Sequence, residues 1–119
     1  MELANEGIST SKVDDGVLVV TFERGRIRDE REILKTLQSL CRYAESQERI
    51  RLLLDMGNIQ YLSSAGLGVL IGLLKKVRSG DGVLKLCSLR EPIQEIFQVM
   101  RLDKIFEIFP HQKAALEAF

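Results

Sequence analysis

Hydrophobic positions along the chain follow two kinds of spacing that alternate with each other. Short apolar runs bounded by turn residues predict β-strands, and apolar residues repeated every three or four positions predict amphipathic helices. Strands are predicted over residues 8–13, 17–22, 50–56, 83–87 and 105–109. Helices are predicted over residues 29–47, from Ser63 or Ser64 to just before Ser79, from Glu91 onward, and over residues 112–119.

The first two predicted strands are joined by Asp14, Asp15 and Gly16. These residue types tolerate the left-handed backbone of a tight hairpin turn, so the two strands are predicted to pair. The first strand is mostly polar, which is typical of a sheet edge, whereas residues 17–22 are rich in β-branched residues and read as buried.

Strands that alternate with helices indicate an α/β fold in which helices cover a mixed sheet. We expect four to five strands, about four helices, and one domain over residues 1–119, because 119 residues suit a single hydrophobic core.

Composition excludes several function classes. Seventeen basic and seventeen acidic residues give no net charge, so nucleic acid is not an expected partner. The apolar stretch 62–74 is interrupted by serines and glycines and is shorter than the roughly 20 residues of a membrane helix. Residues 1–6 lack the basic and apolar pattern of a secretory signal, which predicts a cytoplasmic protein.

The residues that commonly hold metals or redox groups are few. Cys41 and Cys87 lack the spacing of a redox pair and are predicted to be buried, reduced thiols. His111 is the one histidine in the sequence and is predicted to lie on the surface. We therefore expect no metal site and no cofactor.

The segment of residues 63–68 combines two hydroxyls and two glycines at a predicted helix start. Free amide groups at a helix N-terminus favour an anion, and a serine oxygen can cap them. Gly66 and Gly68 are unfavourable in a helix interior, so they indicate that something packs closely there. The alternative is that Ser63 caps the helix, Ser64 is incidental, and the glycines pack against the sheet.

Two catalytic interpretations of this segment fail. A phosphate-binding loop needs a lysine directly after its glycines, but Lys75 and Lys76 lie far downstream. A serine hydrolase turn needs a glycine two residues before the nucleophile, where Ser64 has Leu62. The chain is therefore predicted not to be an enzyme.

Residues 55–70, DMGNIQYLSSAGLGVL, resemble the signature of the STAS domain family, specifically its bacterial anti-sigma factor antagonists. Residues 84–86, 96–97 and 102–109 resemble the closing half of that family. The resemblance places the phosphoacceptor, two residues before the first glycine, at Ser64. Here Ser63 and Ala65 stand where well-known members have aspartate and a hydroxyl residue. The resemblance implies the following partner-binding residues: Tyr61, Leu62, Ser63, Ser64, Ala65, Gly66, Leu67 and Gly68.

The resemblance also implies a partner-switching cycle. The unmodified protein would bind an anti-sigma factor that is a serine kinase, phosphorylation of Ser64 would end that binding, and a serine phosphatase would restore it. An unphosphorylated STAS scaffold in another signalling or transport complex is the alternative. We expect a monomer; the other possibility is that apolar side chains of residues 106–109 are exposed and pair two copies.

Overall fold

The computed structural model describes residues 8–22 and 30–119 of the chain. Within them, five strands form one sheet in the order in which they occur along the sequence, β1-β2-β3-β4-β5. The strands are β1 (Ile8–Lys12), β2 (Leu18–Phe22), β3 (Arg51–Asp55), β4 (Val83–Cys87) and β5 (Glu107–Phe109). The helices are α1 (Glu30–Glu45), α2 (Ser64–Ser79), α3 (Glu91–Val99) and α4 (Gln112–Glu117).

The sheet is mixed, as predicted. β1 pairs with β2 in an antiparallel manner, and every later neighbour pair is parallel. The carboxyl ends of β3 and β4 coincide, since Asp55 pairs with Cys87. The segments that leave these two strands toward α2 and α3 therefore start at the same edge of the sheet.

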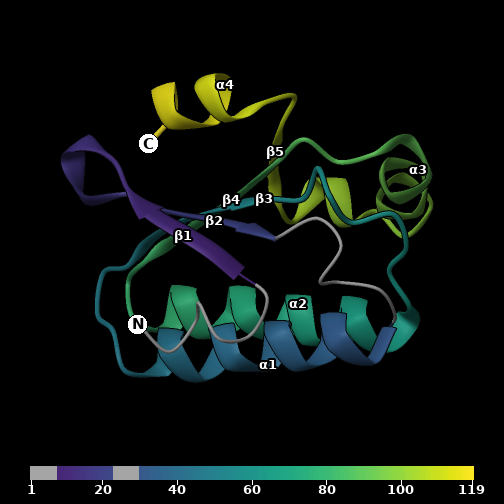
Figure 1. The fold of residues 1–119 in the computed structure, drawn as a ribbon, viewed down its shortest axis with the longest axis horizontal. Helices are drawn as coiled ribbons and strands as arrows, with labels where there is room; N and C mark the ends of the chain where they lie inside the picture. Colours follow the sequence, from purple (N-terminus) through teal and green to yellow (C-terminus); the bar gives the residue numbers. More distant parts are fainter. Residues whose placement is uncertain (1–7, 23–29) are drawn as a thin grey trace.

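The helices form layers on both faces of the sheet. Figure 1 shows α1 and α2 side by side beneath the strands and α4 above them. Strand alternation explains both layers, because consecutive side chains point to opposite faces. In β3, Leu52 and Leu54 belong to the larger core with α1 and α2, whereas Leu53 packs with Ala115 of α4.

The hairpin between β1 and β2 has the predicted left-handed turn. Asp15 and Gly16 have φ angles of 72° and 75°, within the short 3-10 segment η2 (Asp14–Gly16). The backbone N–H of Val13 donates to the Val17 carbonyl across the turn at 3.1 Å. Positive φ at two consecutive positions matches the twist of paired strands, which is why Asp and Gly occur there.

The last strand differs from the prediction over residues 105–109. A second 3-10 segment, η3 (Leu102–Lys104), precedes it, and strand pairing begins at Glu107. Phe106 is buried, with its ring centroid 5.6 Å from that of Phe97. The prediction that residues 106–109 expose their apolar side chains was therefore wrong for Phe106. Phe109 is half-buried and packs against a second, smaller core, whose buried residues are Val17, Val19, Leu53, Cys87 and Ala115.

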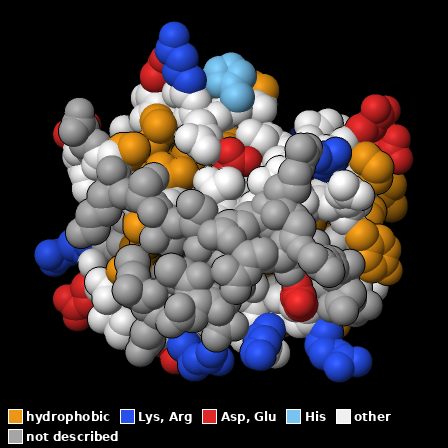
Figure 2. Space-filling model, in the orientation of Figure 1, with side chains coloured by type: hydrophobic (Ala, Val, Ile, Leu, Met, Phe, Trp, Pro, Cys, Tyr) orange, Lys and Arg blue, Asp and Glu red, His pale blue; other side chains and the backbone are white. Residues whose placement is uncertain are grey.

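The exposed apolar side chains near this end of the chain belong instead to Val99, Met100 and Ile105. In Figure 2 hydrophobic side chains gather along the edge where α3 lies. Residues 1–7 and 23–29, which include the N-terminal segment on which the secretory-signal prediction rests, lie outside the described residues. Among the helices in residues 8–22 and 30–119, none has the length and apolar character needed to cross a membrane.

Candidate functional site

Ser64 is the first residue of α2, and its side chain is exposed. The residue before it, Ser63, has an extended backbone and caps the helix: its Oγ accepts a hydrogen bond from the Gly66 N–H at 3.0 Å. The prediction that α2 starts at one of the two serines is confirmed. Because Ser63 serves as the cap, the Ser64 hydroxyl is not needed for that role.

The loop of residues 56–63, which connects β3 to α2, is held by apolar side chains. Met56, Ile59 and Leu62 are buried in the larger core. The Ile59 N–H donates to the Met56 carbonyl at 3.0 Å, which closes a turn at the start of the loop. These anchors fix the backbone that leads into Ser63 and Ser64.

Polar contacts fix the same loop from three directions. Asn58 Nδ2 donates to the Phe22 carbonyl at 2.8 Å, and Arg90 Nε donates to the Gly57 carbonyl at 2.7 Å. Asp55 accepts from the Gly57 N–H at 2.9 Å through Oδ1 and from Gln112 Nε2 at 2.7 Å through Oδ2. Sequence reasoning missed these anchors because the partners of Asn58, Arg90 and Gln112 lie 33 to 57 residues away.

The eight residues that the resemblance assigns to partner binding divide by exposure. Tyr61 is 62% exposed, and Ser64, Ala65 and Gly68 are also exposed, whereas Ser63 is half-buried. Leu62, Gly66 and Leu67 are buried. Leu62 and Leu67 pack in the larger core, so in this conformation they support the segment without contributing to its surface. The exposed members of the set are Tyr61, Ser64, Ala65 and Gly68.

The two glycines of the segment have different local surroundings. A Cβ on Gly66 would come within 2.8 Å of Leu62 Cδ1, so Gly66 gives room to a buried side chain of its own chain. A Cβ on Gly68 would meet nothing within 4 Å. Within the described residues, Gly66 is therefore explained by close packing against Leu62. Gly68 leaves a stretch of the α2 surface without a side chain and open to solvent.

Charge at the start of α2 favours an added anion. The first turn of α2 has no acidic residue, and its free N–H groups carry the positive end of the helix dipole. His111 has a structural role elsewhere: its Nδ1 accepts the Ala114 N–H at 3.2 Å and caps α4. This capping role was not predicted, since an exposed histidine before a helix gives a weak sequence signal.

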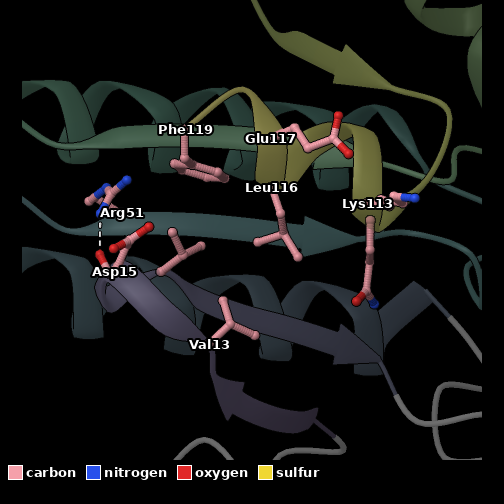
Figure 3. Close-up of a pocket in the computed structure, with 9 residues that line it drawn as sticks. Val13, Asp15, Arg51, Lys113, Leu116, Glu117 and Phe119 are labelled. Carbon is pink, nitrogen blue, oxygen red and sulfur yellow. Dashed lines mark hydrogen bonds between the residues drawn. The ribbon is translucent and has the colours of Figure 1, made fainter.

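A second candidate site is a cavity of about 600 Å³ between α4, the β1–β2 turn and the start of β3. Figure 3 shows Leu116 and Phe119 on one side of it and Val13 on the other. Arg51 donates to the Asp15 carbonyl, and its guanidinium lies 5.7 Å from the centroid of the Phe119 ring. The side chains that line the cavity include both acidic and basic residues, and Arg51 already contacts Asp15 and Phe119. The cavity therefore indicates no particular ligand.

The two thiols are free and belong to different clusters. Cys87 is buried in the smaller core, as predicted, and Cys41 is half-buried next to the larger one. Burial raises the pKa of Cys87 to about 11 and also raises that of Cys41, so neither thiol is activated as a nucleophile. Among the residues that the structure describes, no group of three or more His, Cys, Asp or Glu could hold a metal ion.

Comparison with known proteins gives sequence relatives that are named as anti-sigma factor antagonists. BtrV of Bordetella bronchiseptica, which carries the provisional name of an anti-sigma factor antagonist, is 38% identical over 69 residues. The match covers 58% of this chain and 60% of BtrV, so it spans less than two thirds of that relative's length.

Solved structures of similar fold cover nearly the whole chain. An anti-sigma-factor antagonist (STAS) domain protein from Planctomyces limnophilus superposes with a TM-score of 0.81 at 21% identity, over 93% of this chain and 96% of that one. SpoIIAA, a Bacillus cell fate determinant solved in its phosphorylated form, gives a TM-score of 0.68 at 13% identity, over 94% and 99% of the two chains. The family model described as STAS domain matches residues 11–115. With that match and this fold, the chain belongs to the STAS domain family.

Proposed function

We propose that the chain is a cytoplasmic anti-sigma factor antagonist without catalytic turnover of its own. In this proposal it binds an anti-sigma factor that is a serine kinase, that kinase phosphorylates Ser64, and a serine phosphatase reverses the modification. The names of its relatives support the general role. The observation that carries the proposal is the exposed Ser64 hydroxyl at the start of α2, next to a separate cap on Ser63.

Phosphorylation at this position is compatible with the fold. A phosphoserine adds about −1.5 to −2 charge, and near a helix N-terminus each favourable contact is worth roughly 0.3–1 kcal/mol. The cap does not change, because Ser63 makes it. The domain therefore keeps its structure while its surface charge changes.

The same group acts against a partner packed on this surface. Gly68 has no side chain and Ala65 has only a methyl group, so a partner can approach the helix backbone closely around Ser64. A dianion buried there would be poorly solvated, and unfavourable charge contacts in interfaces cost several kcal/mol. A loss of about 3 kcal/mol already weakens binding more than a hundredfold.

The test starts with proteins that copurify with the wild-type chain from its native cell. The captured kinase is incubated with the chain and ATP, and intact mass is measured for the gain of one phosphate. We expect that gain in the wild-type chain and its absence in Ser64→Ala, which keeps kinase binding. Ser64→Asp is expected to weaken binding more than about tenfold.

Ser79→Asp is the matched control, because Ser79 is an exposed serine at the opposite end of the same helix. It adds the same charge without touching the proposed surface, so it should bind like the wild-type chain. Equal binding by Ser64→Ala and Ser64→Asp would contradict the switch. Stable binding to a partner with no phosphate gained would favour the unphosphorylated scaffold instead.

A further inference from the structure

The carboxylate of Asp55 joins two parts of the chain that are far apart in sequence. Asp55 is the last residue of β3, and its Oδ1 accepts the Gly57 N–H at 2.9 Å. Its Oδ2 accepts from Gln112 Nε2, the side chain of the first residue of α4, at 2.7 Å. One carboxylate therefore links α4, which lies on the sheet face opposite α1 and α2, to the loop that leads to Ser64.

Gly57 is held tightly enough for this link to matter. Its carbonyl accepts from Arg90 Nε at 2.7 Å, and a Cβ on it would lie 3.1 Å from Asp55 Oδ1. Met56 and Ile59 on either side are buried, and Ile59 closes a turn back onto Met56. Because Gly57 lies this close to Oδ1, a turn of the Asp55 carboxylate would act first on the Gly57 N–H, within the loop of residues 56–63 that leads to Ser64.

Gln112 sets that direction, because it binds the carboxylate oxygen that Gly57 does not use. Charge-assisted hydrogen bonds of this kind are short and directional. Without the amide donor, the Gly57 N–H alone orients the carboxylate among these contacts, and Oδ2 can turn toward water.

We propose that Gln112 is a positioning residue for the binding surface formed by Tyr61, Ser64, Ala65 and Gly68, acting through Asp55 and Gly57. This inference rests on the function proposed above, and it adds a residue of α4 to those that determine the position of the binding surface. Displacement of α4 would thereby alter partner binding from the opposite face of the sheet.

The experiment replaces the donor without changing side-chain volume. Gln112→Glu puts a second acceptor opposite Asp55, so the contact is lost by like-charge repulsion. Hydrogen exchange of the Gly57 amide, followed by NMR, is expected to quicken about tenfold, since a hydrogen bond to a charged group is weakened. The amide shifts of Tyr61 and Ser64 should move with it, and affinity for the copurified kinase should fall about tenfold.

Lys113→Gln is the matched control. It changes an exposed neighbour on the same helix and lowers the net charge by the same single unit. The Gly57 exchange rate and kinase affinity of this variant should stay within about twofold of wild type. An equal effect of both variants would overturn the proposal, because the change would then come from charge or from loosening of α4.

The double variant Asp55→Asn with Gln112→Glu tests the direction of the bond. The new amide keeps an oxygen for the Gly57 N–H and offers an N–H to the new carboxylate, while the summed charge of the pair is unchanged. Gly57 protection, the amide shifts and kinase affinity should return toward wild type. Failure of this rescue, or normal kinase binding in Gln112→Glu despite lost Gly57 protection, would overturn the proposal.

The two proposals fail in different ways. If the wild-type chain binds no kinase and gains no phosphate, the proposed function fails. The amide shifts and exchange rates of the same variants would still decide whether Gln112 sets the position of the loop.

Discussion

Two adjacent serines at the start of α2 divide two tasks between them. Ser63 Oγ accepts the Gly66 N–H and closes the helix, while Ser64 is exposed on the surface. In the family signature that this segment resembles, well-known members have an aspartate at the position of Ser63. Both residue types are good N-caps, so the local structure is compatible with either one.

Replacing the cap gives a direct test of this division. Ser63→Ala removes the acceptor for the Gly66 N–H and is expected to lower the free energy of unfolding by about 1 kcal/mol. Ser63→Asp should keep the wild-type value, because a carboxylate also caps. Urea unfolding followed by circular dichroism measures both, and equal losses in the two variants would show that Ser63 does not act as a cap.

Gly68 offers a second test at the residue scale. Because a Cβ there meets nothing within 4 Å, Gly68→Ala is expected to stabilise the free protein by about 0.5–1 kcal/mol through helix propensity. The same methyl group should weaken binding of the kinase, since it raises the surface beside Ser64.

Gly72→Ala serves as its control, since a Cβ on Gly72 also meets open space, one helical turn further from Ser64. It should give a similar stability gain with little change in binding. If Gly68→Ala binds as tightly as the wild-type chain, the partner does not approach α2 at that turn.

Among the elements, α4 and the residues after it pack against the smaller core, which includes Leu53, Cys87 and Ala115. Lys85 of β4 is 4% exposed, and its Nζ lies 2.9 Å from Glu107 Oε1 and 5.1 Å from the centroid of the Phe119 ring. An ammonium group so buried needs such partners, because desolvation of an unpaired charge is costly. β5 and the end of the chain thus provide contacts that keep this face of the sheet closed.

Cys87, in the same core as Ala115 of α4, allows a prediction of how the free energy of unfolding changes as the pH rises. Burial raises the pKa of Cys87 to about 11 from an ordinary value of 9.0. A hydrogen bond with Ser88 lowers it, and the charge of Asp55 raises it by a smaller effect. The folded state therefore holds the proton more tightly than the unfolded state. The stabilisation from this linkage is complete below pH about 9 and is lost as the pH rises toward about 11.

Urea unfolding measured across this pH range should show the loss in the wild-type chain. The decline should be shallower in Cys87→Ala, which starts from a lower stability because of the cavity it leaves. Cys41→Ala, on the half-buried thiol, is the comparison and should keep most of the decline. Parallel curves for all three proteins would contradict the linkage.

Elements with a strong local pattern were predicted well from the sequence. The strand Val83–Cys87 and the start of α2 agree with the prediction, because each depends on neighbours a few residues away. β5 was predicted too long, since the burial of Phe106 against Phe97 is a tertiary contact without a local signal. The assignment of Ser64 came from the family resemblance and stays a prediction. The hydrogen bonds of Gln112 to Asp55 and of Arg90 to Gly57 were not predicted, because their partners lie far apart in the sequence.

At the scale of the whole molecule, the proposed switch is a change of surface on a fixed body. The Cα radius of gyration is 13.0 Å, and the loop before Ser64 is anchored by buried Met56, Ile59 and Leu62. Nothing in the phosphorylation step calls for these anchors to release.

We therefore expect phosphorylated and unmodified chains to have the same radius of gyration in small-angle X-ray scattering. Their melting temperatures should differ by only a few degrees, since the dipole contact is worth roughly 0.3–1 kcal/mol. Ser64→Asp should behave like the phosphorylated chain in both measurements. Expansion of the phosphorylated chain would show that the switch works by partial unfolding.

The sequential strand order also bears on how the protein is made. As the polypeptide leaves the ribosome, each new strand finds the edge on which it belongs already formed, because its neighbour was synthesised just before it. α4 comes last and lies across the face that includes Leu53 and Cys87. Until residues 112–119 emerge, the nascent chain presents an apolar sheet face, and this is the stage at which we expect a chaperone to bind it.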